Sequence, residues 1–183
     1  QFARDNSRDP GLRTRVLESL RLEGRGPLQK ASLDLLLALS QDTSIELREA
    51  AVGKLGELDD AEIKNELSRI ARNLEEDAGV RSVAIYGMRI DDEQETIDFL
   101  LTTTQHKDPE LRRAALTRFH DIEFGNGVLN QFHDQIKAES DPEIVETLLE
   151  LIGQRGSAES VPVLSRLGKD EKGPLYLRNY AAE

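Results

Sequence analysis

Histidines and carboxylates are the residues of this sequence that could bind a metal or transfer a proton. There are three histidines, His106, His120 and His133, and no cysteine. A metal site on a helix needs ligands four residues apart, or an acidic residue beside each histidine. Only His133, which Asp134 follows, comes near this pattern, and we interpret the two as a solvated polar pair. The lack of cysteine excludes a disulfide framework, a thiolate zinc site and a cysteine nucleophile.

Acidic residues gather in three short clusters, at 59–60, 75–77 and 91–93. Each cluster precedes or begins a predicted helix, where acids serve as caps and solvated turns. None has the spacing of a calcium loop or of a catalytic carboxylate pair, and the sequence has no phosphate-binding glycine loop and no nucleophile elbow. We therefore predict no catalytic residue, no metal, no cofactor and no enzymatic activity.

The charge of the chain is strongly acidic and unevenly spread. The net charge is -11, with +3 in residues 1–30 and -14 in the remainder. An acidic body disfavours nucleic acid and anionic membranes, and no apolar run approaches the roughly 20 residues that span a bilayer. We expect no nucleic-acid partner and no direct membrane insertion. The oligomeric state stays open, and the location is the cytoplasm or an exported compartment after removal of a signal.

A repeated pattern determines which elements position these side chains. An aliphatic residue, taken as an anchor, recurs after 35, 33, 31, 33 and 33 residues, at Leu12, Leu47, Val80, Leu111, Ile144 and Leu177. Apolar residues follow each anchor four and five places later, and eight places later where the chain continues. Positions 0, 4, 5 and 8 share one face of an α-helix, so each copy predicts an amphipathic helix with these positions buried.

The beginnings of these helices have a physical cause. An aspartate can cap the first free N–H groups, and the candidates are Asp9, Asp42, Asp77, Asp108 and Asp141. Proline then stands at the first helical position, where no amide is required, at Pro10, Pro109 and Pro142. Asp42 lies five residues before its anchor whereas the others lie three before, so Ile45 and Glu46 are interpreted as a local insertion.

Further apolar stripes predict a helix between each of these copies. Their expected ranges are 28–40, 60–73, 92–105, 127–139 and 158–168. Each unit is thus a helix, a turn and a helix in about 33 residues. Such a pair cannot bury its apolar face alone, so neighbouring pairs must stack into a continuous core. We expect an all-α fold over a single domain, residues 1–183, that belongs to a longer natural protein.

The recurring D-P-x-[LV]-R-x-x-A run resembles the second helix of HEAT repeats, in particular the short HEAT-like class first noted in phycobilisome lyases. The best matches are DPELRRAA at 108–115 and GVRSVA at 79–84. The signatures of tetratricopeptide and ankyrin repeats are absent. The resemblance implies a right-handed α–α superhelix, a HEAT-type solenoid of about five helix pairs. It also implies that the arginine after the anchor ties neighbouring repeats together, at Arg13, Arg48, Arg81, Arg112 and Arg178, with an interruption at Val145.

In solenoids of this family the second helices line the concave side, and positions two, six and nine after the anchor are expected to be exposed. They include Ser82 and the candidate partner-binding residues Tyr86, Arg89, Arg113, Thr117 and His120. Tyrosine flanked by arginine is favoured at interface hot spots, and Gly53 beside it could leave room for an inserted side chain. The alternative is that Tyr86 only covers its own helix pair.

The sequence therefore favours a protein-protein interaction module or scaffold whose partner is another protein or a peptide. The alternative is a HEAT-like-repeat enzyme, a lyase or a metal-dependent modifying enzyme, whose catalytic residues are not recognisable here. The di-iron hydroxylases that resemble this repeat class use His-Glu pairs, and this sequence has none.

Overall fold

The chain folds into repeated helix pairs. The computed structural model describes residues 9–18, 27–90, 94–156 and 158–169, and all regular secondary structure in these ranges is helical. Contacts divide the chain into two compact units, Gln1–Arg89 and Ile90–Glu183. No helix in the described ranges has the length and apolar character needed to cross a membrane. The single domain over residues 1–183 stays a prediction.

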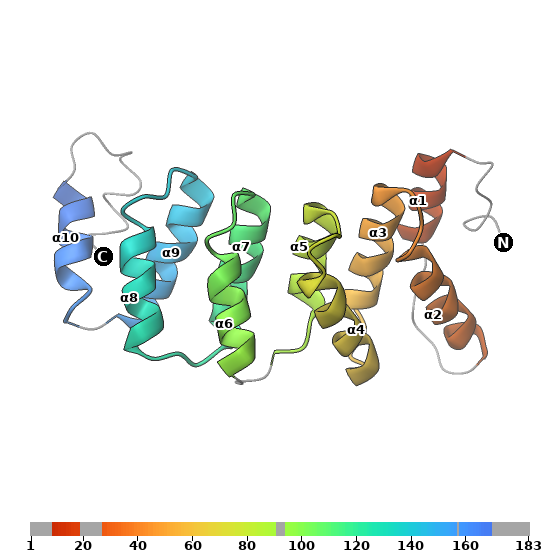
Figure 1. Ribbon diagram of the computed structural model, residues 1–183, viewed down its shortest axis with the longest axis horizontal. Helices are drawn as coiled ribbons and strands as arrows, with labels where there is room; N and C mark the ends of the chain where they lie inside the picture. The colour runs from red at the N-terminus through yellow and green to blue at the C-terminus, as the bar shows by residue number, and fades with distance from the viewer. Residues whose placement is uncertain (1–8, 19–26, 91–93, 157, 170–183) are drawn as a thin grey trace. The chain divides into compact units, whose positions relative to one another are not determined.

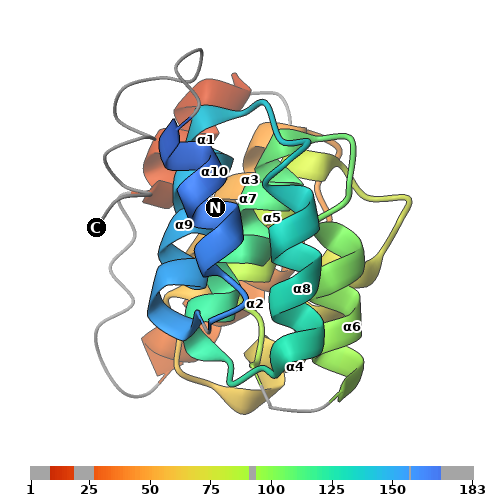
Figure 2. The ribbon, with the colours of Figure 1, turned by 90° about the vertical axis from the view of Figure 1, so that its left-hand side faces the viewer.

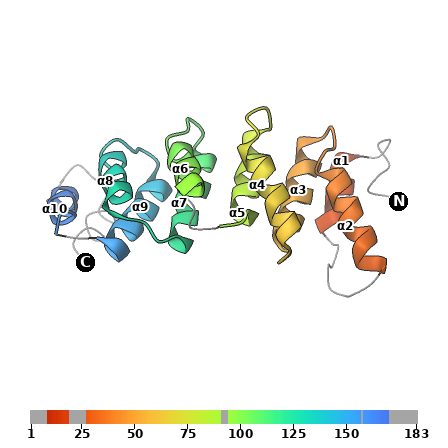
Figure 3. The same ribbon diagram turned by 60° about the horizontal axis from the view of Figure 1, so that its bottom comes forward.

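The first unit contains five of the helices (Figure 1). They are α1 (Pro10–Glu18), α2 (Pro27–Leu39), α3 (Ile45–Gly56), α4 (Ala61–Arg72) and α5 (Ala78–Gly87). Helix α3 contacts α1, α2, α4 and α5, and α4 also packs along α5. The pairs α2–α3 and α4–α5 are therefore stacked repeats, with the second helices α1, α3 and α5 in one row (Figure 3).

The second unit repeats this arrangement. Its elements are α6 (Gln94–Thr103), α7 (Pro109–Arg118), the short 3-10 helix η2 (Phe119–Asp121), α8 (Asn126–Gln135), α9 (Pro142–Arg155) and α10 (Val161–Lys169). Helix α7 contacts α6 and α9, and α8 contacts α9. The first helices α6 and α8 lie side by side in one layer, and α7 and α9 form the other (Figure 2).

The predicted core positions are buried in the four inner copies. All sixteen side chains at positions 0, 4, 5 and 8 after Leu47, Val80, Leu111 and Ile144 are buried. In α1 the prediction is wrong for two of them, because Leu12 is 51% exposed and Val16 is 37% exposed. No earlier helix among the described residues covers this face of α1. The last copy, which begins at Leu177, lies outside the described residues.

Aspartate caps begin four of the five described second helices. Asp9, Asp77, Asp108 and Asp141 each accept hydrogen bonds from the first turn, at 2.9 to 3.3 Å. Asp42 does not cap α3, contrary to the prediction, because Ser44 accepts the hydrogen bond from Leu47 N at 3.4 Å. Ser44 lies three residues before its anchor, like the other caps. Ile45 is therefore an ordinary first-turn residue rather than part of an insertion.

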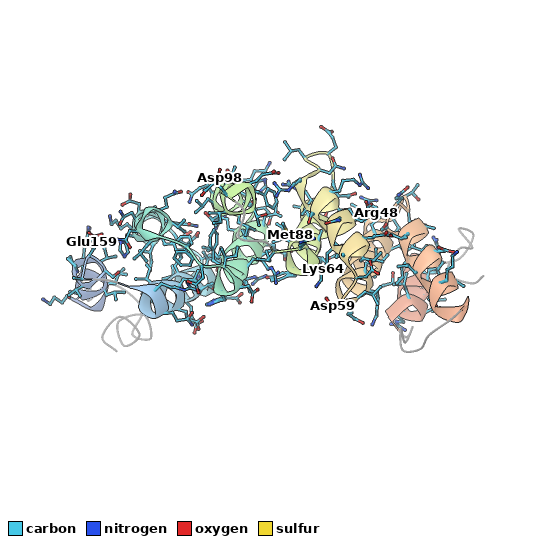
Figure 4. All side chains as sticks on the ribbon, turned by 90° about the horizontal axis from the view of Figure 1, so that it is seen from below. Arg48, Asp59, Lys64, Met88, Asp98 and Glu159 are labelled. Carbon is cyan, nitrogen blue, oxygen red and sulfur yellow. The ribbon has the colours of Figure 1, made fainter. Side chains whose placement is uncertain are left out.

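Arginines after three of the anchors join successive repeats, as the resemblance implied. The nitrogen–oxygen distances are 2.8 to 2.9 Å in the bridges Arg13–Asp42, Arg48–Glu76 and Arg112–Glu139. The side chain of Arg48, labelled in Figure 4, donates from both Nε and Nη2 to one oxygen of Glu76, and its Nη1 donates to Asp42 O at 2.9 Å. Arg178 lies outside the described residues.

Two of the bridges, those of Asp42 and Glu139, hold their carboxylates in the charged form. Burial alone would raise the pKa of Glu139, but the guanidinium of Arg112 and the N–H groups of Asp141 and Ser140 lower it below its ordinary value. Asp42 behaves in the same way, since the N–H of Ser44 and the guanidinium of Arg13 outweigh burial and lower its pKa. Each carboxylate is thus satisfied both by its arginine and by the backbone that enters the next helix.

Candidate partner-binding surface

Helix α7 presents two of the predicted residues on one face. Its anchor Leu111 and the residues of the core positions are buried, which leaves Arg113 and Thr117 half-buried on the other side of the helix. They stand one turn apart, and Thr117 Oγ1 donates to Arg113 O at 2.9 Å. His120 lies beyond the end of α7, in η2, so its position is not set by the α-helical register that predicted it.

Polar side chains of α9 meet this face of α7. Arg113 Nη1 contacts the carboxylate of Glu143. His120 Nδ1 lies 3.2 Å from Gln154 Oε1, and its Nε2 lies 3.8 Å from a carboxylate oxygen of Glu150. The side chains of Arg113 and Glu143 are 40% and 69% exposed, so their pair contributes little to stability and can exchange partners.

A recess of about 410 Å³ lies between the starts of α7 and α9. Its lining residues are Pro109, Glu110, Arg113, Asp141, Pro142, Glu143 and Ile144. The two prolines supply apolar walls. The three acidic residues supply hydrogen-bond acceptors, and the guanidinium of Arg113 supplies hydrogen-bond donors. The recess can therefore accept a side chain that is apolar along its length and polar at its tip.

Two predicted residues belong to the first unit. Tyr86 on α5 is 44% exposed, and Arg89 is exposed just after α5 ends at Gly87. The structure thus brings Arg113, Thr117 and His120 together in the second unit and places Tyr86 and Arg89 in the first. Their binding role stays a prediction.

One expectation about the surface of α5 is wrong. Ser82 is only 5% exposed, and its Oγ donates back to Gly79 O at 2.9 Å. A methyl group on Gly53 would lie 3.5 Å from Val83 Cγ1. This is an ordinary van der Waals distance, so the expectation that Gly53 of α3 leaves room for an inserted side chain stays a prediction.

His133 is buried, not solvated as its sequence context indicated. The residue is 5% exposed, and Nε2 lies 2.9 Å from Ser160 Oγ, just before α10. Burial lowers the pKa of His133, and Lys137 lowers it further, while Glu159 and Asp134 oppose the shift. Across the described ranges, no three His, Asp or Glu side chains stand close enough together to share a metal ion.

The residues that the sequence reasoning missed are the partners of the predicted ones. Glu143 and Gln154 lie 30 and 34 residues after Arg113 and His120, which is one repeat further along the chain. The carboxylates of the arginine bridges have a similar signal, because they follow their arginines by 27 to 29 residues. A search for polar residues one period apart would have found both sets.

Comparisons with known proteins agree with this architecture. A crystal structure of computationally designed armadillo repeat proteins for modular peptide recognition is similar to the chain, with a TM-score of 0.56 and 16% identity. The likeness covers 97% of this chain and 93% of the designed one. At this identity it shows the fold alone: the protein is an all-α protein of stacked helix pairs, an α–α superhelix.

The match to a family model is more specific than the structural likeness. Residues 32–118 match the family model described as HEAT repeats, which covers α3, α4, α5, α6 and α7 completely. Over this range the chain is similar to HEAT repeats, as the D-P-x-[LV]-R-x-x-A pattern indicated. A search of the curated proteins finds no match.

Proposed function

We propose that the chain is a non-catalytic protein-binding module, and that a segment of its partner lies across the second helices α7 and α9. The observation that carries the proposal is the recess between the starts of these helices, where the exposed pair Arg113–Glu143 can exchange partners. HEAT and armadillo repeats commonly mediate protein-protein interaction, and the designed armadillo proteins bear a title that names peptide recognition.

The charges of the surface favour a partner segment with donors. Glu110, Asp141 and Glu143 around the recess outnumber Arg113, and Glu150 adds a carboxylate near His120. A lysine or arginine of the partner can place its aliphatic stem between Pro109 and Pro142 and its charge among the acids. Tyr86 is proposed as a second contact, in the first unit, because it is exposed.

Photo-crosslinking tests the proposal at one position. Thr117 is replaced by a photoreactive amino acid, and extract of the source cells is irradiated. Thr117 stands between Arg113 and His120, and among the described residues its side chain hydrogen-bonds only within its own helix. The matched control carries the same group at Asn130, which is exposed on the first helix α8. A specific adduct at position 117 and none at 130 supports the proposal. Equal labelling at both positions contradicts it.

Glu143→Lys sharpens this test. Reversal of this charge places a cation in the recess, where it should repel the lysine or arginine of the partner, while the fold, checked by circular dichroism, is retained. The adduct at position 117 should then fall at least about fivefold, as expected for an interface residue worth about 1 kcal/mol or more. Tyr86→Ala in a separate variant tests the contact in the first unit. Stoichiometric iron or zinc in the purified protein would instead favour the enzymatic alternative.

A further inference from the structure

A second hollow of the second unit adjoins the recess between α7 and α9. It is a pocket of about 550 Å³ at the ends of α6 and α8, the two first helices that lie side by side (Figure 2). Arg112 lines this pocket and its chain neighbour Arg113 lines the recess, so the two hollows meet at the start of α7. A pocket of this volume can accept a small ligand or a side chain of a partner.

Glutamine side chains supply most of the uncharged polar groups of this pocket. Gln135 is only 9% exposed, and its Oε1 accepts a hydrogen bond from Gln105 Nε2 at 3.1 Å. Its Nε2 donates to Thr104 O at 2.7 Å. A carboxamide can donate two hydrogen bonds and accept two, so within the described residues Gln135 keeps one N–H and one oxygen lone pair unused. Gln131 also lines the pocket and is exposed. A buried amide with unused bonding capacity beside a cavity favours a polar ligand.

The charged groups of the pocket favour a neutral ligand. Two carboxylates line it, and both already have partners: Asp134 pairs with Lys137 at 2.7 Å. Glu139 pairs with Arg112 at 2.9 Å. These carboxylates and the carbonyl ends of α6 and α8 disfavour an anion. His106 Nδ1 accepts a backbone N–H at 3.0 Å, which leaves the ring proton on Nε2 as a donor. A neutral group with both donors and acceptors therefore fits the pocket best.

We propose that this pocket binds the side-chain amide of a glutamine or asparagine in the partner segment. The oxygen of the ligand accepts from the unused N–H of Gln135, and its NH₂ group donates to the glutamine oxygens of the pocket. The inference rests on the proposed function, because it gives the segment across α7 and α9 a second contact. A segment with a cationic side chain in the recess can place a neighbouring side chain in the adjoining pocket.

A titration with blocked peptides tests the site on the purified protein. Each peptide has one central residue between two glycines, with an acetyl group at one end and an N-methylamide at the other. The central residue is glutamine, glutamate or methionine. The side-chain amide signals of Gln131 and Gln135 are followed by NMR in uniformly ¹⁵N-labelled protein. The reference is Gln94, which lies at the start of α6 and donates to Asp98. With the glutamine peptide the two pocket signals should move in a saturable way and further than the reference.

The comparison of the three peptides identifies the chemical group that is bound. Glutamate has nearly the shape of glutamine but lacks its N–H donors, and methionine has a similar length but no amide. Both peptides should bind at least about fivefold more weakly than the glutamine peptide, because each loses hydrogen bonds to the pocket. Equal dissociation constants for the three peptides, or no saturable movement with glutamine, would overturn the proposal.

Ala138→Phe tests whether the peptide occupies the pocket. Ala138 lines the pocket and is exposed, so a phenylalanine there should fill the pocket while the fold, checked by circular dichroism, is retained. The dissociation constant of the glutamine peptide should rise at least about tenfold. The matched control is Asn130→Phe, at an exposed position of α8 that does not line the pocket, and it should leave the dissociation constant unchanged. Equal dissociation constants in the two variants would contradict the proposal.

The crosslinking experiment separates this proposal from the proposed function. In Ala138→Phe the adduct at position 117 should fall at least about fivefold, as expected when the partner loses an interface contact. An unchanged adduct in this variant would show that the partner does not use the pocket, and the proposed function would stand. Absence of the adduct in the wild type contradicts the proposed function, and the peptide titration then still decides whether the pocket binds an amide.

Discussion

The two units use the same repeat but join their second helices differently. In the first unit α3 and α5 meet through glycine, because a Cβ on Gly87 would lie 2.8 Å from Gly56 Cα and 2.8 Å from Leu67 Cδ1. In the second unit the equivalent places on α7 and α9 hold His120 and Leu151, and His120 contacts polar residues of α9.

This difference shows that the same repeat register supports two kinds of contact between neighbouring second helices. Where backbones touch, no side chain can intervene, and the contact depends on shape alone. Where side chains meet, the contact between the helices carries charges and hydrogen-bonding groups. The second unit also holds an aromatic cluster, in which Phe132 packs edge-on against Phe119 at 5.1 Å and Phe124 at 5.5 Å between ring centroids.

The aromatic cluster should give the largest single effect. Phe132 is fully buried, and Phe132→Ala would leave a cavity in its place. We expect a loss of about 4 kcal/mol in the free energy of unfolding, measured by urea denaturation followed by circular dichroism. Phe124→Ala is the matched control and should lose less, because Phe124 is only half-buried. A loss from Phe132→Ala below that of its control would show that the cluster does not hold the second unit.

The close glycine contact between α3 and α5 should give the next largest effect on stability. Gly87→Leu forces a side chain into the contact with Gly56 and Leu67, and overpacking of this kind costs about 3 kcal/mol. The control is Gly153→Ala in α9, where nothing lies within 4 Å of the added methyl. That variant should gain up to about 1 kcal/mol from helix propensity. Equal losses in both variants would mean that the close approach is not specific to the first unit.

Acid should weaken the second unit through His133. Burial lowers the pKa of His133 in the folded chain. Below about pH 6.5 the histidine is therefore protonated in the unfolded chain but stays neutral in the folded chain until the pH reaches the lowered pKa. Stability is therefore unaffected above this pH and is lost as the pH falls below it, down to the lowered pKa. His133→Gln, which can keep a hydrogen bond to Ser160, should match the wild type near pH 7.5 and lose less stability near pH 5.5. Parallel pH profiles of the two proteins would exclude His133 as the cause.

The exposed pair Arg113–Glu143, which joins α7 and α9, should matter least for stability. Arg113→Ala removes the contact with Glu143, and a pair this exposed is worth about 0.5 kcal/mol or less. The change in melting temperature should shrink further in 0.5 M salt. A loss well above 1 kcal/mol that persists in salt would make Arg113 a structural residue and weaken its assignment to a binding surface.

The sequence alone was sufficient to predict the helices and most of the buried core positions. Period, caps and prolines place α7 and α9 correctly, since each begins with Asp-Pro three residues before a buried anchor. The surface was less predictable, because exposure depends on how closely helices approach. Ser82 is buried although its place in the helical register predicts exposure.

The arginine bridges show the same limit. The resemblance indicated which arginines bridge repeats but not where each carboxylate stands. Arg112 finds Glu139 in the turn that enters α9, whereas Arg81 turns to Ala71 O at the end of α4. His133 was misjudged for a related reason, since its partner Ser160 lies 27 residues away in the next repeat.

The short span of the arginine bridges also bears on how the chain folds. Each bridge joins residues only 27 to 29 apart, so its two ends meet within one repeat length. Contacts this local in sequence close with little loss of chain entropy and are associated with fast folding. A bridge can form during synthesis as soon as about 30 residues beyond its arginine have left the ribosome, and each completed repeat then becomes the template on which the next one docks.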